Sequence, residues 1–151
     1  MNRIAVLLAE DHMVVREGLR KLLEAERDIE VVGEAATGRQ AVDLVRKLHP
    51  AVVVMDIAMP LLNGVEATRQ IRQAVPDARV LILSAHSDDA YVERVTALGA
   101  VGYLIKQTSA HFLSEAIREV QKGNTFFSPS IAKRLRHRDQ ESLGRKALSK
   151  V

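Results

Sequence analysis

The sequence contains no cysteine and no tryptophan, and only two tyrosines and three phenylalanines stand among its 151 residues. The lack of cysteine excludes a disulfide framework and a zinc site with thiolate ligands, and it leads us to expect a cytoplasmic protein. Because aromatic residues make up 3% and hydrophobic residues 47%, a core has to be built from aliphatic side chains. No apolar run is long enough to cross a membrane, and we expect no signal peptide.

An excess of acidic residues is also lacking, and the net charge is +3. The positive charge is concentrated near the end of the sequence. Residues 131–151 carry a net charge of +5, whereas the first 130 residues carry a net charge of −2. A basic tail can bind nucleic acid, but a solvated linker is the simpler interpretation, and it is the one that we favour.

Five short aliphatic runs recur along the first 130 residues, and segments with helical spacing separate them. Four of the five runs are almost continuously apolar, which is typical of strands buried on both faces of a parallel sheet. The runs are 4–8, 29–32, 52–55, 80–83 and 102–105. Alternation of strands and helices predicts an α/β fold with right-handed crossovers.

We therefore predict a doubly wound, five-stranded parallel sheet between two layers of helices, a three-layer α/β/α arrangement with the flavodoxin-like strand order 2-1-3-4-5. The alternating pattern ends at Phe127. One domain is expected over residues 1–127, followed by a basic linker over residues 128–151. In that linker Ser128-Pro129 is typical of a helix start, so we expect a short helix and then a flexible end.

Polar residues end four of the five expected strands. Glu10-Asp11 follow the first strand, Asp56 the third, Ser84 the fourth and Lys106 the fifth. Open α/β sheets bind ligands beyond the carboxyl ends of their strands, so these side chains are expected at one edge. Taken singly, such a carboxylate is more often a helix cap and such a lysine is usually solvated. The joint occurrence is what indicates a functional site.

Three carboxylates at one edge repel one another unless a cation lies among them. Mg²⁺ prefers oxygen ligands from carboxylates, water and phosphate. Lys106 adds a positive charge and Ser84 a hydroxyl donor. A carboxylate can act as a nucleophile by forming an aspartyl phosphate, and the metal and the lysine would stabilise the charge of the transferring group. The sequence therefore predicts a Mg²⁺-assisted phosphoryl-acceptor site.

Several motifs resemble those of two-component receiver domains, over about residues 3–125. They are Glu10-Asp11-His12, Met55-Asp56-Ile57-Ala58-Met59-Pro60 with Gly64, Ser84-Ala85, and Gly99-Ala100-Val101-Gly102-Tyr103-Leu104-Ile105-Lys106. Other stretches resemble the NarL/FixJ branch, in which a LuxR-type helix-turn-helix domain normally follows the receiver. These are Val15-Arg16-Glu17-Gly18-Leu19, Val32-Gly33-Glu34-Ala35, and Gly123-Asn124-Thr125-Phe126-Phe127-Ser128-Pro129.

The resemblance implies a metal-assisted acceptor. Asp56 would accept the phosphoryl group, and a sensor histidine kinase would supply it. Asp11, Asp56 and the backbone carbonyl of Ala58 would bind Mg²⁺, and Glu10 would act on the metal mostly through water.

The resemblance also implies a switch. Ser84 and Lys106 would contact the phosphoryl oxygens, and Tyr103 would be the switch aromatic whose ring position depends on Ser84. The alternative for Tyr103 is an edge aromatic that simply packs on the sheet. Gln107 stands where many receivers have a proline, which excludes a cis-proline there. His12 is expected to pack near the start of the first helix.

A signalling switch is therefore expected rather than a turnover enzyme. A haloacid-dehalogenase-type phosphatase would need a second aspartate two residues after the nucleophile, and Ala58 stands there. About two dozen residues follow Phe127, too few for a helix-turn-helix domain, so we expect DNA contact only through an output domain absent from this sequence. A homodimer is a further expectation. The alternative is a stand-alone single-domain receiver that acts by protein–protein interaction.

Overall fold

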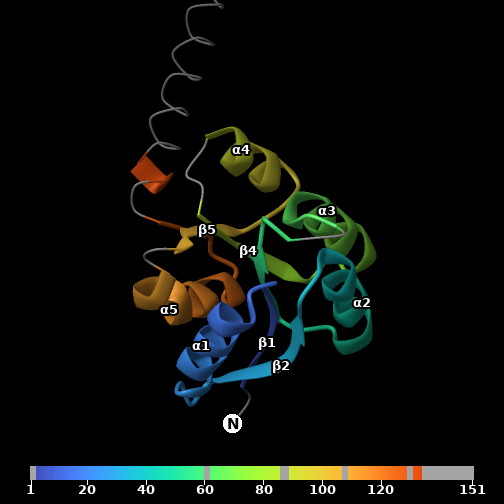
Figure 1. Ribbon diagram of the computed structural model, residues 1–151. Coiled ribbons are helices and arrows are strands. Elements are labelled where there is room, and N and C mark those ends of the chain that lie inside the picture. Colours follow the sequence, from blue (N-terminus) through green and yellow to red (C-terminus); the bar gives the residue numbers. More distant parts are fainter. Residues whose placement is uncertain (1–2, 60–61, 86–88, 107–108, 129–130, 134–151) are drawn as a thin grey trace, which may run out of the picture.

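Parallel strands form a single sheet in the computed structural model, which describes residues 3–59, 62–85, 89–106, 109–128 and 131–133 (Figure 1). The strand order is β2-β1-β3-β4-β5-β6. The strands are β1 Ile4–Ala9, β2 Ile29–Ala35, β3 Val52–Asp56, β4 Arg79–Ser84, β5 Gly102–Ile105 and β6 Phe126–Phe127. The predicted α/β class and the order of the first five strands are confirmed.

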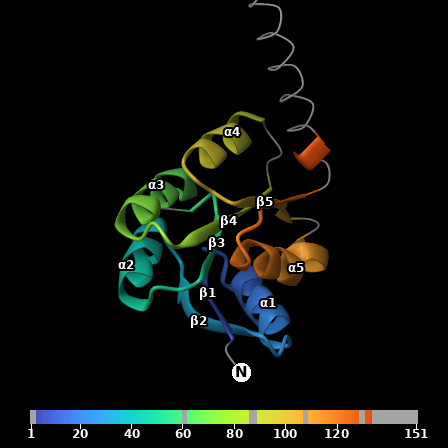
Figure 2. The ribbon, with the colours of Figure 1, turned by 180° about the vertical axis from the view of Figure 1, so that it is seen from behind.

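Helices cover both faces of the sheet, as predicted (Figures 1 and 2). The helices α1 Met13–Glu24 and α5 Ser109–Gln121 pack on one face, and α2 Gly38–Leu48, α3 Gly64–Ala74 and α4 Asp89–Ala97 pack on the other. Alternate residues of each central strand point to opposite faces, so Leu7 and Leu8 of β1 belong to different cores. No helix within the described ranges is both long enough and apolar enough to cross a membrane.

The sixth strand corrects the prediction of a five-stranded sheet. β6 runs parallel to β5, with Phe126 beside Gly102 and Phe127 beside Tyr103. A Cβ atom at Gly102 would lie 2.6 Å from the carbonyl oxygen of Phe126, so this close approach of two backbones requires glycine. A two-residue strand has no periodicity, which is why the sequence pattern did not predict it.

Side-chain caps begin two of the helices, and a third starts differently. The Thr37 hydroxyl accepts a hydrogen bond from the Gln40 amide at the start of α2, and the Asn63 side chain accepts one from the Glu66 amide at the start of α3. His12 occupies the same position before α1, but among the described residues its side chain makes no capping hydrogen bond. The reason is that its ring is directed at the carboxylates after β1.

Gly38, the first residue of α2, has no room for a larger side chain. A Cβ atom at Gly38 would lie 1.8 Å from the carbonyl oxygen of Leu62, in the loop between Asp56 and α3. Gly38→Ala should therefore lower the free energy of unfolding by about 1–3 kcal/mol, measured by urea denaturation. Gly18→Ala is the control, because a Cβ atom there meets nothing within 4 Å inside α1 and should stabilise the helix by up to about 1 kcal/mol. A Gly38→Ala protein as stable as wild type would contradict the prediction.

Candidate functional site

The carboxyl ends of four parallel strands bring the predicted site residues to one edge of the sheet. In the strand register Ala9 of β1 lies beside Met55 of β3. The residues that follow them, Glu10 and Asp56, therefore lie at the ends of adjacent strands. Asp56 lies beside Leu83, and Ser84 lies beside Ile105. Parallel pairing thus places carboxylates, a hydroxyl and a lysine together, although up to about a hundred residues of sequence separate them.

A lysine bridges two buried carboxylates at this edge. The Nζ atom of Lys106 lies 3.0 Å from Oε2 of Glu10 and 3.1 Å from Oδ2 of Asp56. Both acidic side chains are almost fully buried, whereas the lysine side chain is 23% exposed. One ammonium group therefore lies between two carboxylates in a site that it partly covers, and the contact of Lys106 with phosphoryl oxygens stays a prediction.

The pKa values of the two acids are shifted in opposite directions. Burial, and then the charge of Glu10, raise the pKa of Asp56 to about 6, although Lys106 works against them. Burial also acts to raise the pKa of Glu10, but hydrogen bonds from His12 and Lys106 outweigh it and lower that pKa. Lys106 keeps a raised pKa despite its own burial because both carboxylates favour its charged form. Asp56 is thus the acid that binds a proton more readily.

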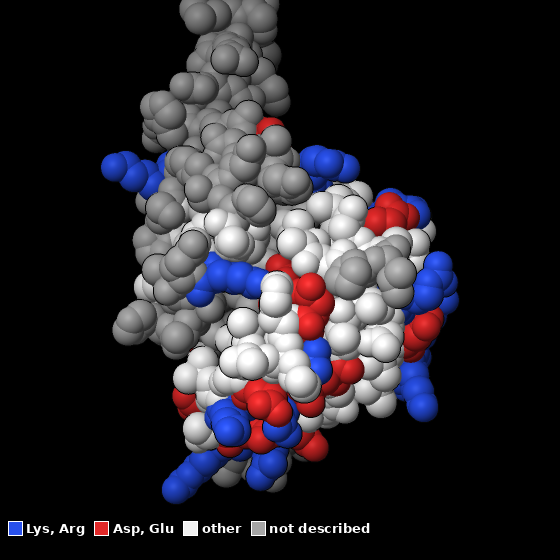
Figure 3. All heavy atoms as spheres, viewed as in Figure 1, with Lys and Arg blue, Asp and Glu red and all other residues white. Residues whose placement is uncertain are grey.

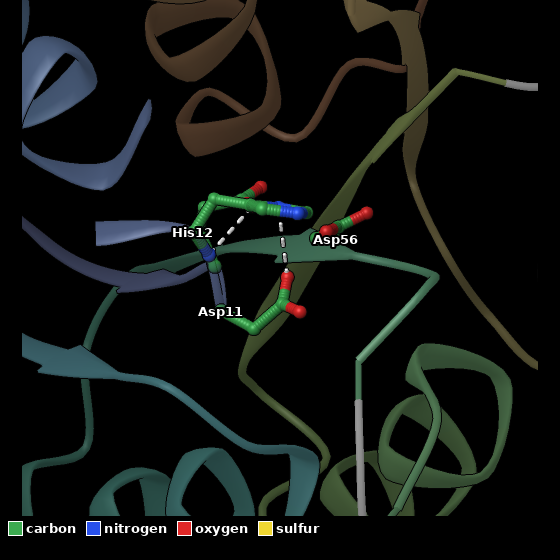
Figure 4. A group of neighbouring side chains, drawn as sticks. Asp11, His12 and Asp56 are labelled. Carbon is green, nitrogen blue, oxygen red and sulfur yellow. Dashed lines mark hydrogen bonds and ion pairs between the residues drawn. The ribbon is translucent and has the colours of Figure 1, made fainter. Parts of the chain in front are cut away.

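His12 is a member of the site that sequence reasoning did not identify. Its Nδ1 atom lies 2.9 Å from Oε1 of Glu10 and 3.2 Å from Oδ1 of Asp11, and its backbone amide donates to Glu10 at 3.2 Å (Figure 4). The hydrogen bond to Glu10, and then the charges of Asp11 and Glu10, raise the pKa of His12. The one sequence signal for this role is its place directly after the acidic pair at the strand end.

The donor atoms of the site suit a divalent cation. Glu10, Asp11, His12 and Asp56 each offer one ligand atom, and these atoms all lie within 4.8 Å of one another. The Oδ1 atom of Asp11 is buried and, among the described residues, accepts no hydrogen bond. A predominantly oxygen donor set with three carboxylates is the kind that Mg²⁺ and Mn²⁺ take up, and an unbonded buried oxygen is open to such a ligand. The residues present therefore fit the predicted metal.

The loop after Asp56 closes tightly on the site. The amide of Ala58 donates to Oδ1 of Asp56 at 3.2 Å, and the amide of Gly64 donates to the carbonyl of Ile57 at 2.8 Å. A Cβ atom at Gly64 would lie 2.6 Å from the carbonyl oxygen of Asp56, so glycine allows α3 to start against the end of β3. The Ala58 carbonyl as a metal ligand stays a prediction.

Ser84 and Tyr103 are both buried, Ser84 at the end of β4 and Tyr103 within β5. Ser84 is the last residue of β4, and Tyr103 lies in β5 between Ile82 of β4 and Phe127 of β6. Tyr103 belongs to the core beneath α2, α3 and α4. Their roles in switching stay predictions. Pro60, His86 and Gln107 lie outside the described residues.

Part of the site reaches the surface. Figure 3 shows one face of the molecule, with acidic side chains gathered near its centre and basic side chains beside them. Lys106 and Asp11 are both partly exposed, whereas Glu10 and Asp56 lie beneath the surface. Asp11 and Lys106 therefore form the part of the site that reaches the surface.

The family model and the similar curated proteins all indicate the same family. The model of the response regulator receiver domain matches residues 6–118. The transcriptional regulatory protein DegU of Brevibacillus brevis is 43% identical over 134 residues, which cover 89% of this chain and 57% of DegU. The transcriptional regulatory protein LiaR of Bacillus subtilis is 40% identical over 151 residues, which cover 97% of this chain and 72% of LiaR.

Solved structures agree with these relatives. The crystal structure of a LuxR-family two-component response regulator from Aurantimonas sp. SI85-9A1 superimposes with a TM-score of 0.86 at 37% sequence identity, covering 91% of this chain and 99% of that one. The receiver domain of the response regulator NarL from Mycobacterium tuberculosis superimposes with a TM-score of 0.79 at 31% identity, covering 82% of this chain and all of that one. The chain belongs to the receiver domain family of two-component response regulators, on its NarL/FixJ branch.

Proposed function

We propose that Asp56 is the phospho-acceptor of a signalling switch and that a sensor histidine kinase is its donor. The observation that carries the proposal is the buried Asp56 carboxylate, held 3.1 Å from the Lys106 ammonium beside Glu10 at the carboxyl edge of the sheet. The curated relatives are response regulators and not turnover enzymes, and they support the same role.

In the proposed reaction an oxygen of the Asp56 carboxylate forms a bond to the phosphorus of the donor. The bond from phosphorus to the leaving group breaks, and the leaving group keeps the electron pair and takes a proton from solvent. Asp56 must be ionised to react, which Lys106 favours and burial opposes. Lys106 lies close enough to Asp56 to stabilise negative charge first on the carboxylate and then on the phosphoryl oxygens.

Mg²⁺ would be held by Asp11, Asp56 and the carbonyl of Ala58, with Glu10 acting through water. When bound, the cation supplies positive charge that offsets the repulsion between the acceptor and the incoming phosphoryl group. His12 contacts two of these carboxylates at 2.9 and 3.2 Å, so it competes with a metal for the same oxygens. Before a cation binds, Glu10 therefore keeps its hydrogen bond with His12, whereas the buried Oδ1 of Asp11 accepts none among the described residues.

Ser84 and Tyr103 are proposed as the switch. A phosphoryl group on Asp56 would offer Ser84 a charge-assisted hydrogen bond that exists only in the phosphorylated arrangement. Such a bond shifts an equilibrium between two arrangements, and couplings of this kind are typically about 1–3 kcal/mol. Tyr103 would take the space that Ser84 leaves, and the buried position of both side chains supports this order of events.

For the whole protein we propose control of transcription through a DNA-binding output domain, because the relatives DegU and LiaR are transcriptional regulatory proteins and the chain spans 57% and 72% of their lengths. Homodimerisation and a cytoplasmic location belong to the same proposal. A stand-alone receiver that acts by protein–protein interaction is the alternative. The complete reading frame separates the two.

Phosphorylation should depend on one carboxylate. Incubation with acetyl phosphate and Mg²⁺ should add one phosphoryl group to the intact chain, measured by mass spectrometry, because Asp56 alone combines a neighbouring ammonium with a position at the end of β3. Asp56→Asn should abolish the addition. Asp77→Asn, at an exposed position outside the site, is the matched control and should leave it intact. Undiminished labelling of the Asp56→Asn protein would exclude Asp56 as the acceptor.

Mg²⁺ binding should depend on Asp11. Because a cation that binds only the folded state stabilises it, the melting temperature of the wild type should rise with Mg²⁺ concentration. Asp11→Ala removes a carboxylate of the cluster and should weaken the apparent affinity about tenfold or more, a loss of at least about 1.4 kcal/mol. Asp43→Ala, at an exposed position on α2, is the control. Equal Mg²⁺ dependence in wild type and Asp11→Ala would place the cation elsewhere.

A further inference from the structure

Ser128 is a buried polar residue that follows the short edge strand β6. Only 2% of its surface is exposed. Its backbone amide donates to the carbonyl of Tyr103 at 2.9 Å, and its hydroxyl accepts a hydrogen bond from the amide of Ile105 at 3.0 Å. Ser128 thus bonds to β5 at two points, one at the proposed switch aromatic and one at the residue before Lys106.

The hydroxyl of Ser128 accepts a hydrogen bond from the sheet and does not cap the helix that its sequence context predicts. Ser128-Pro129 is typical of a helix cap, and the carbonyl of Ser128 does accept from the amides of Ile131 and Ala132. The side chain, however, points to the amide of Ile105. A single residue therefore joins the end of β5 to the turn that begins at Ile131.

The turn after Ser128 is anchored in the core. Ile131 is 1% exposed and belongs to the same hydrophobic cluster as Tyr103 and Val95. In Figures 1 and 2 residues 131–133, drawn in red, appear beside α4 and above α5 in both views. The hydrogen bonds of Ser128 and the buried side chain of Ile131 can therefore transmit a displacement of β5 to residues 131–133.

We propose that Ser128 is a positioning residue that couples the acceptor site to the chain segment beyond the sheet. The proposal rests on the proposed function, because it takes Asp56 as the place where the signal begins. Lys106 contacts Asp56 and directly follows Ile105, whose amide Ser128 holds. A phosphoryl group that draws Lys106 or Tyr103 to a new position changes the end of β5, and Ser128 carries that change to Ile131 and Ala132.

The test follows backbone amide chemical shifts of the full chain by NMR when beryllofluoride, an acyl-phosphate mimic, is added with Mg²⁺. The amides of Ala58 and Gly64 report on the acceptor site, and those of Ile131 and Ala132 report on the segment beyond the sheet. In the wild type both pairs should shift. In Ser128→Ala and Ser128→Cys the first pair should still shift and the response of the second pair should be lost.

The two variants separate hydrogen bonding from packing. Alanine removes the hydroxyl and leaves a void, whereas cysteine fills the space with a sulfur that is only a weak acceptor. Loss in both variants is the expected result. Ser114→Ala, a half-buried serine of α5, is the control and should respond as the wild type does. The shifts at Ala58 and Gly64 also show that each variant is folded and binds the mimic.

Three outcomes would overturn the coupling. They are wild-type responses at Ile131 and Ala132 in both variants, loss in Ser128→Ala alone, and a wild type in which Ala58 shifts while Ile131 and Ala132 do not. A wild type in which even Ala58 and Gly64 do not shift would instead contradict the proposed function itself, and the coupling with it.

Discussion

The contact of one ammonium group with two buried carboxylates is the constraint on which the site depends. Taking a carboxylate out of water costs several kcal/mol unless an opposite charge and hydrogen bonds compensate. Lys106 lies within 3.1 Å of both Glu10 and Asp56, but one positive charge does not neutralise two negative ones. Burial, and then the charge of Glu10, raise the pKa of Asp56, and the remaining negative charge gives the site its attraction for a second cation.

The rest of the fold keeps these three groups together. An aliphatic core on both faces of the sheet fixes the strands in register, so that residues far apart in the sequence end at the same edge. Hydrogen bonds of His12 to Glu10 and of Ala58 to Asp56 hold the carboxylates from the sides. At the outer edge Ser128 holds the end of β5, which carries the lysine. The position of Lys106 beside Asp56 and the position of the chain at Ser128 therefore both depend on the end of β5.

Much of this arrangement could be predicted from the sequence, because its signals are local and regular. Aliphatic runs predicted the first five strands, and the rule that parallel strands end at one edge predicted that the residues following them would gather there, where Lys106 lies close to Asp56 and Glu10. The features that were missed have no such period. β6 has only two residues. His12 and Ser128 stand where the sequence indicates helix starts, but their side chains hydrogen-bond to Glu10 and to the amide of Ile105 instead of capping a helix. The division between a domain over 1–127 and a linker over 128–151 stays a prediction, although Ser128 and Ile131 are buried against the domain.

The protonation of Asp56 is the most direct consequence of the account. Because its folded pKa of about 6 lies above the ordinary value of 3.8, the folded state binds a proton that the unfolded state lacks between about pH 4 and 6. Stability therefore falls as the pH rises through that window, and a cation that favours the charged form should restore it. Carbon-13 NMR of the Asp56 side-chain carboxyl, titrated without and with Mg²⁺, tests this. The titration midpoint of Asp56 should lie at about 6 without Mg²⁺ and clearly lower with it, whereas an ordinary midpoint of about 3.9 under both conditions would show that burial and Glu10 do not shift this carboxyl.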